Sequence, residues 1–147
     1  MDETNTLDDA NSATNSRKTA VVLLDSLQQW QRLNVTAFTI SGVASEPGAV
    51  GEPYQDASGQ TYLPMFKDPV LVFGASSDLL LRTAERARSR QVAFSIFTED
   101  LFATFNDEDN RTAVRAVTTE SLRLVALAFR CERKTADKIL KGLKLLS

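Results

Sequence analysis

Four short segments of the chain are almost wholly apolar, and they constrain the fold more than any other feature. They are residues 18–25 (KTAVVLLD), 69–74 (PVLVFG), 92–97 (VAFSIF) and 121–129 (SLRLVALAF). A β-strand with water on one face alternates apolar and polar residues, whereas a strand covered on both faces is continuously apolar. The four segments therefore predict a single α/β domain, with a mixed, mostly parallel sheet and helices on both faces.

Segments with helical spacing lie between these strands. Ser26 is the predicted N-cap of a first helix that ends at Gly42. Ser76 or Ser77 caps a second helix over residues 78–90, so the strands before and after it should run parallel. Thr98 caps a short third helix, and further helices are predicted over residues 107–117 and 134–145. The side chains expected to face inward are Leu27, Trp30, Asn34, Ala37, Phe38, Ser41, Leu80, Ala84, Ala87, Leu101, Phe102 and Phe105.

Residues 45–66 (SEPGAVGEPYQDASGQTYLPMF) break this alternation. They include three of the four prolines and three of the six glycines, a composition typical of loops and turns. Ser58 and Gly59 predict a turn between two short strands, one around Tyr54 and the other around Tyr62.

The first sixteen residues are polar and contain four acids and no base. They offer no apolar surface to offset the entropy of ordering, so we predict a disordered acidic tail at residues 1–16 and a folded domain over 17–147. The basic and apolar stretches of a signal peptide are missing, and no apolar run approaches the roughly twenty residues that span a bilayer. We expect a cytoplasmic protein without membrane contact.

The chain contains no histidine and a single cysteine, Cys131. This composition excludes nucleophiles activated by imidazole, nearly every common zinc site and any intramolecular disulfide. Residues 47–51 lack the lysine and hydroxyl residue of a phosphate-binding loop, and residues 106–110 lack the glycine of a calcium loop. We predict no metal and no cofactor, and we expect Cys131 to be chemically inert.

Several motifs in this order of elements resemble those of a known family. They are KTAVVLLD, LQQWQRLNVTAF, DLLLRTAERARSRQVAFSIFTEDLFAT and the ending RKTADKILKGLKLL. Over residues 18–147 the chain resembles the type 2 peptidyl-tRNA hydrolases, and the resemblance implies their fold. The chain is more similar still to an uncharacterised bacterial family of that fold. In that family a tryptophan and an asparagine in the first helix, a Phe-Thr-x-x-x-Phe-x-Thr stretch and an Asp-Lys-Ile ending recur.

The chain departs from the hydrolases at the positions that serve their chemistry. Leu33 or Asn34 aligns loosely with their functional lysine, and the Gly-Lys segment around it is missing. Their Asp-Ala-Gly-x-Thr loop corresponds to residues 100–104 (DLFAT), which keep Asp100 and Thr104 but replace the glycine with bulky apolar residues. The Gly-Pro pairs after the next strand are also absent. We therefore expect no peptidyl-tRNA hydrolysis by the mechanism of that family.

Asp100 and Thr104 form the candidate catalytic pair, because they lie one helical turn apart and supply a base and a hydroxyl donor. Alternatively, Asp100 only stabilises the first turn of its helix. An unpaired amide in the predicted inner stripe would cost roughly 1–3 kcal/mol, so we expect Asn34 to have partners in the sheet or a pocket. The candidate ligand-binding residues are Asp25, at the carboxyl end of the first strand, Trp30, Asn34 and Thr98.

The end of the chain is basic, with six bases and two acids from Arg130 onward. This excess favours either a weak RNA contact or the ordinary preference for cations near the C-terminal end of a helix. Three functions fit the sequence. They are a small-ligand-binding or non-catalytic module on the hydrolase-like fold, a hydrolase of aminoacyl or peptidyl esters such as peptidyl-tRNA, and a structural homodimer. The missing lysine and glycine favour the first of these.

Overall fold

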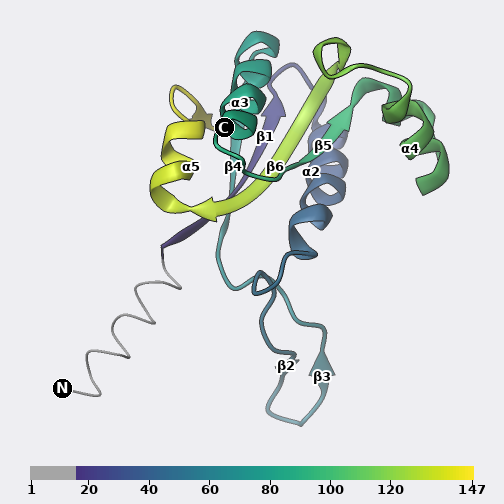
Figure 1. Ribbon diagram of the computed structural model, residues 1–147. Helices are drawn as coiled ribbons and strands as arrows, with labels where there is room; N and C mark the ends of the chain where they lie inside the picture. Colours follow the sequence, from purple (N-terminus) through teal and green to yellow (C-terminus); the bar gives the residue numbers. More distant parts are fainter. Residues whose placement is uncertain (1–15) are drawn as a thin grey trace.

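A computed structural model describes residues 16–147, and nearly all of the predicted tail lies outside this range. Five strands form one sheet in the order β5-β6-β1-β4-β7 (Figure 1). The predicted apolar strands are confirmed with small shifts at their ends, and β7 is an additional strand. The strands are Arg17–Leu24 (β1), Val70–Ala75 (β4), Ser95–Thr98 (β5), Leu124–Glu132 (β6) and Lys144–Leu145 (β7).

The sheet is mixed, but the prediction that it is mostly parallel is wrong. Only β1 and β4 pair in parallel, and the other three neighbouring pairs are antiparallel. The strands β4 and β5 run in the same direction, but β6 and β1 lie between them. The two ends of the connection from β5 to β6 lie side by side, because the backbone N–H of Glu99 donates to the carbonyl of Arg123 at 3.0 Å. Strand β6 therefore begins where β5 ends and runs back beside it.

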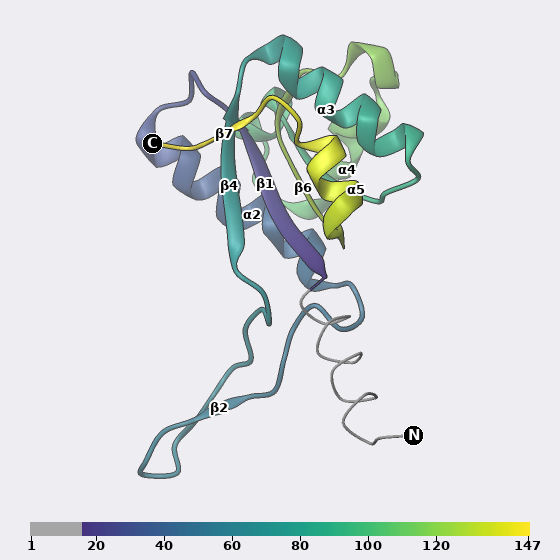
Figure 2. The ribbon, with the colours of Figure 1, turned by 90° about the vertical axis from the view of Figure 1, so that its left-hand side faces the viewer.

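Helices cover both faces of the sheet, as predicted (Figure 2). In β1, Ala20 and Val22 pack into the core on one face, whereas Val21 and Leu23 pack into the core on the other. Burial on both sides explains why the strand is continuously apolar. One face carries α3 (Ser77–Ser89) and α5 (Arg133–Ile139), and the other carries α2 (Gln29–Ala44), the 3-10 helix η1 (Glu99–Ala103) and α4 (Asp107–Arg115). A second 3-10 turn, η2 (Thr119–Ser121), precedes β6.

Helix α2 is rotated relative to the sequence prediction. Its buried residues are Val35, Thr39 and Val43, and its N-cap is Gln28 rather than Ser26. Trp30 is 59% exposed, so the prediction that it is a buried anchor is wrong. The cause is a close approach at Gly42, where a Cβ atom would lie 2.8 Å from the Cβ of Ser95. Small and β-branched residues must face the sheet there, and the large side chains turn outward. Phe38 and Leu33 are exposed for the same reason.

A two-stranded hairpin projects from the body of the molecule after α2 (Figures 1 and 2). Its strands, Tyr54–Gln55 (β2) and Thr61–Tyr62 (β3), are antiparallel, as predicted, and Gly59 takes φ +85 in the turn. Asp56 accepts hydrogen bonds from the backbone of Ser58 and Gln60 and from the hydroxyl of Tyr62. The bond with the phenol lowers the pKa of Asp56 and raises the pKa of Tyr62. We call residues 51–65 the arm.

The last predicted helix is shorter than expected, with 7 residues in place of the range 134–145. Helix α5 ends at Ile139, and a turn follows in which Gly142 takes φ +87 and the N–H of Leu143 donates to the carbonyl of Leu140 at 3.0 Å. The chain then adds β7 to the free edge of β4, and the N–H of Leu146 donates to the carbonyl of Val72 at 2.9 Å. The basic residues at this end are consequently not collected on one helix.

Candidate functional site

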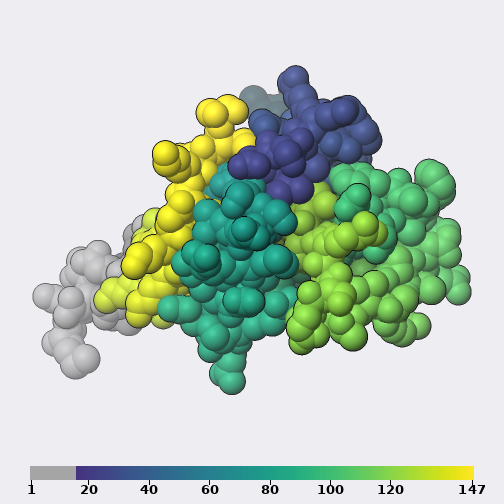
Figure 3. Space-filling view, turned by 90° about the horizontal axis from the view of Figure 1, so that it is seen from above, coloured from purple at the N-terminus to yellow at the C-terminus, as the bar shows by residue number. Residues whose placement is uncertain are grey.

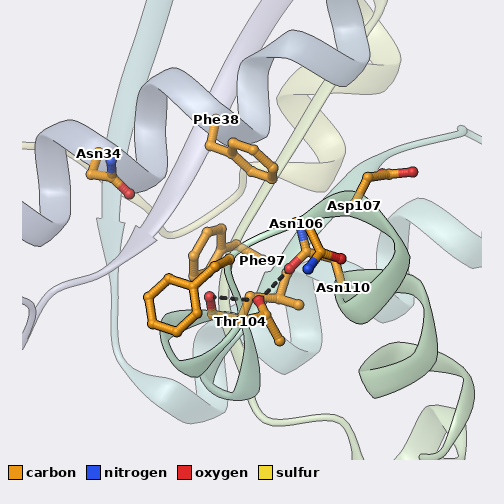
Figure 4. Close-up of a pocket in the computed structure, with 9 residues that line it drawn as sticks. Asn34, Phe38, Phe97, Thr104, Asn106, Asp107 and Asn110 are labelled. Atoms are coloured by element: carbon orange, nitrogen blue, oxygen red, sulfur yellow. Dashed lines mark hydrogen bonds between the residues drawn. The ribbon is translucent and has the colours of Figure 1, made fainter.

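A cavity of about 380 Å³ lies between α2, η1 and α4. Viewed from above, the green segment that contains η1 and α4 lies beside the start of α2 (Figure 3). Both apolar and polar side chains line the cavity (Figure 4). The apolar lining consists of Phe38, Phe97, Leu101 and Phe105, and the polar lining consists of Asn34, Thr104, Asn106, Asp107 and Asn110.

The apolar wall is held by a row of aromatic contacts. Phe38 meets Phe97 edge to face at a centroid distance of 6.0 Å, and Phe97 lies 5.0 Å from Phe102. Phe102 in turn meets Trp30 at 6.4 Å. Edge-to-face and tilted pairs at these distances are favourable arrangements of aromatic rings. Trp30 thus supports the cavity wall from outside without lining the cavity.

Thr104 and Asn110 form the polar centre of the site. Thr104 immediately follows η1, and its hydroxyl lies within hydrogen-bond distance of the carbonyl of Leu101, at 3.1 Å, and of the side-chain oxygen of Asn110. A hydroxyl has one proton, so it can donate to only one of these oxygens at a time. Asn106 places Asn110 by capping α4, since its side-chain oxygen accepts from the N–H of Asp109 at 2.8 Å.

Asn34 faces this centre from α2 (Figure 4). It is exposed rather than buried, and the expectation that it needs a hydrogen-bond partner in the sheet is wrong because the rotation of α2 leaves its amide in contact with solvent. Within residues 16–147 its side chain makes no hydrogen bond. Asp107, the one charged residue of the lining, is paired with Arg111 at 2.8 Å, and this carboxylate raises the pKa of Arg111.

The structure does not bring all of the predicted site residues together in one site. Thr104 and Asn34 line the cavity together, but the cavity lining does not include Asp100. The carboxylate of Asp100 accepts a hydrogen bond from Arg123 at 2.8 Å. Asp25 lines a separate hollow of about 370 Å³ at the carboxyl ends of β1 and β4. Thr98 is buried at the N-cap of η1, where its side chain makes no capping hydrogen bond.

Sequence reasoning missed Asn106 and Asn110 as lining residues. The signal was present, because two asparagines four residues apart occupy one side of a helix. What the sequence does not reveal is that α4 folds back against α2. Across the described residues 16–147, no cluster of acids and cysteine could hold a metal ion.

One of the basic residues of the C-terminal region is buried. Arg130 is 8% exposed, and its guanidinium is bonded to Asp68 at 3.1 Å, so it cannot face a phosphate. Cys131 is buried, and burial raises the pKa of its thiol to about 11. This value agrees with the expectation that the thiol is inert, because the thiolate is the reactive species. None of the helices in the described region is both long and apolar enough to cross a membrane.

Comparisons with known proteins place this fold in a family. No curated protein matches the chain. A solved structure of a protein of unknown function from Agrobacterium tumefaciens strain C58 is similar, with a TM-score of 0.84 and 38% sequence identity. The similarity covers 90% of this chain and 98% of that one. A family model described as protein of unknown function matches residues 17–147, and the chain therefore belongs to the DUF2000 family.

Proposed function

We propose that the protein binds a small, uncharged ligand in the cavity between α2, η1 and α4, and that the ligand carries an amide-like group on an apolar body. The observation that supports this proposal is the pairing of an aromatic wall with side-chain amides at one centre. Ligand sites are usually concave and mostly apolar, with a few polar groups that fix orientation. Phe38 and Phe97 supply the wall, and Asn34 and Asn110 supply the amides.

The chemistry of the lining favours a neutral ligand. An asparagine side chain both donates and accepts, so Asn34 and Asn110 together match a ligand group that does the same. The carboxylate of Asp107 is paired with Arg111 in a solvent-exposed ion pair. Among the described residues that line this cavity there is no lysine or arginine to attract a phosphate or a carboxylate.

The size of the cavity favours a small molecule. A volume of about 380 Å³ is near the lower end of the range for small-molecule clefts, roughly 300–1,000 Å³. A second hollow of about 410 Å³ shares Phe38, Leu101, Asp107 and Asn110 with it and continues toward Val114. The second hollow leaves room for a substituent on the ligand, and Arg111 and Arg115 in its lining favour a hydrogen-bond acceptor there.

A titration with benzamide tests the proposal, because this probe joins an uncharged amide to an aromatic ring. We expect ligand-observed NMR signals that disappear in Asn34→Leu and Thr104→Val, which remove the polar groups with little change of shape. Gln29→Leu is the matched control, since Gln29 is exposed on the same helix but does not line the cavity. Binding that is unchanged in both cavity variants, or equally weakened in the control, would refute the proposal.

Ester hydrolysis by Asp100 and Thr104 is the alternative function, on a fold resembling that of the type 2 peptidyl-tRNA hydrolases. The position of Thr104 in the cavity supports it. The engagement of Asp100 by Arg123 weighs against it, because a general base must reach the water that it activates. The lining also offers no cation to stabilise an oxyanion.

We expect no turnover of peptidyl-tRNA that depends on Asp100. The assay compares the wild type with Asp100→Asn and Thr104→Ala, after circular dichroism has shown that the variants are equally folded. Turnover that is lost in either variant would establish the hydrolase instead. Salt-sensitive binding without turnover, reduced by Lys138→Ala and Lys141→Ala, would indicate an RNA contact without chemistry.

A further inference from the structure

Two apolar surfaces of this chain are exposed and do not contact each other. One is the outer stripe of α2 together with the rim of the cavity, where Phe105 is 93% exposed. The other is the arm, where Leu63 is 85% exposed. We define the recipient face as Trp30, Leu33, Phe38 and Phe105, and the arm face as Tyr54, Tyr62, Leu63 and Met65.

We propose that the protein forms a two-fold homodimer in which the arm face of each protomer covers the recipient face of the other. Within one chain the two faces remain apart, because the arm leaves the body beyond the C-terminal end of α2 and points away from it (Figures 1 and 2). In a two-fold dimer both contacts form at once, and no copy of either face is left over. The proposal concerns assembly and does not require a ligand, but Phe38 and Phe105 also line the cavity, so the arm of the partner would lie over its mouth.

The arm is held by contacts at both of its ends, in the turn and at the root. A lone two-stranded hairpin is marginally stable in water. Here the turn is held by the hydrogen bonds to Asp56, and the root is held where Gly51 donates to the carbonyl of Met65 at 3.0 Å. Beyond the root, the ion pair between Arg130 and Asp68 is buried and anchors the following segment to β6. The turn and the root of the arm are thus held by hydrogen bonds, and its apolar side chains are exposed to solvent.

The areas of the two faces match the requirement of a stable dimer. Each protomer presents eight large apolar side chains, and the exposed part of each is on the order of 100 Å². Complete covering would bury roughly 800 Å² per protomer, the usual size of a specific interface. The lengths match as well. Strand geometry gives roughly 10 Å from Tyr62 to Met65 on the arm, and helix geometry gives roughly 12 Å from Trp30 to Phe38 on α2.

The composition and charge of the faces also match. Interface centres are poor in charged residues and rich in aromatic residues and methionine. Helix α2 contains a single charged residue, Arg32, and the arm beyond Pro53 contains a single one, Asp56. The two charges are opposite. Contact between the two faces therefore brings together no charges of like sign.

The oligomeric state in solution tests the proposal. Sedimentation of the wild type should give a dimer, and Leu63→Asp with Met65→Asp should reduce the mass to the 16.2 kDa of one chain. Trp30→Asp with Leu33→Asp should have the same effect from the other face. All four side chains are exposed in the single chain, so circular dichroism and the melting temperature of the monomer should show an intact fold. Leu81→Asp is the control, because Leu81 is partly exposed on α3, on the opposite side of the sheet, and should leave the dimer unchanged.

Cross-linking identifies which faces meet. A chain with Leu33→Cys is mixed with a chain with Leu63→Cys and treated with a flexible bismaleimide. The native thiol contributes little background, because Cys131 is buried. We expect cross-linked dimers from this mixture and none when Leu81→Cys replaces Leu33→Cys. A wild type that is monomeric up to the limit of solubility would overturn the proposal. A dimer that survives the substitutions on both faces would overturn it as well.

Discussion

Helices α3 and α2 cover opposite faces of the same sheet, yet the sequence identifies the buried side of only one of them. In α3, Leu80, Ala84 and Ala87 face the core, as their spacing predicts, and charged residues occupy the outward positions. In α2 there is one charge, and apolar or small residues lie on every side. The comparison indicates that charges mark the outer side of a helix more reliably than large apolar residues mark its inner side.

The tightness of packing decides the orientation of α2. Gly42 lies so close to Ser95 that no side chain fits between helix and sheet, and the hydroxyl of Ser95 donates to the carbonyl of Thr39 at 2.6 Å. The large side chains of Trp30 and Phe38 point away from the sheet and contact the rings of Phe102 and Phe97 instead. Four predictions test this contrast between the two helices.

The largest effect is expected on the α3 side of the sheet. Leu80 is fully buried, so Leu80→Ala should lower the free energy of unfolding by about 2–5 kcal/mol through lost burial and a residual cavity. Urea denaturation followed by circular dichroism measures this change. Leu81→Ala, on the partly exposed side of the same helix, should cost no more than about 1 kcal/mol. Equal losses of unfolding free energy in the two variants would mean that the buried side of α3 is no better defined than that of α2.

The second prediction concerns the contact that orients α2. Gly42→Val should lower the free energy of unfolding by about 1–3 kcal/mol, because the new side chain would overlap Ser95. Ala44→Val is the control, since Ala44 is exposed at the end of the same helix, and it should change stability by about 0.5 kcal/mol or less. A Gly42 variant as stable as this control would show that close packing does not set the rotation.

A smaller loss is expected at Trp30, in spite of its size. In the monomeric arm variant, Trp30→Ala should cost about 1 kcal/mol, which corresponds to its edge contact with Phe102. In the same monomeric variant, before Trp30 is replaced, the emission of this single tryptophan should be quenched by iodide. A loss of about 3–5 kcal/mol would mean that the indole is buried after all.

The last prediction compares a thiol in the core on the α3 side of the sheet, that of Cys131, with a thiol introduced on the surface of α2. It involves no change in stability. The pKa of Cys131 is about 11, so at pH 8 roughly one molecule in a thousand carries the reactive thiolate. Labelling by a disulfide reagent should therefore be slow at pH 8 and should accelerate as the pH rises toward 11. In the monomeric arm variant, where no partner covers position 33, a cysteine introduced by Leu33→Cys should react much faster than Cys131 at pH 8. Fast labelling of the wild type at pH 8 would place Cys131 outside the core.

Much of the fold could be predicted from the sequence, because the strands are short apolar runs and the caps are local. Ser76 caps α3 by accepting from the N–H of Leu79, as its place in the sequence indicates. The strand order could not be predicted, because it depends on contacts between segments far apart in the chain. The antiparallel pairing of β5 with β6, and the hydrogen bond between Glu99 and Arg123 beside it, leave no local signal.

The candidate site could be predicted only in part, for a similar reason. Thr104 and Asn34 were found because they lie in segments that resemble a known site. Asp100 was grouped with Thr104 on the basis of helical spacing, but η1 is a 3-10 helix and Thr104 has an extended backbone at its end, so the two side chains take different directions. Arg123, which binds Asp100, comes from a turn twenty-three residues later in the chain.

The pairing of β1 with β6 has a consequence for the synthesis of the protein. Arg17 lies opposite Glu132, so the central strand of the sheet has one edge open until residue 132 has been made. At roughly 10 residues per second, this takes on the order of 10 s, during which β1 can pair only with β4. Contacts so distant in sequence also slow folding after synthesis. For that interval the nascent chain carries a largely apolar strand with free backbone groups, the kind of edge that recruits other chains into aggregates.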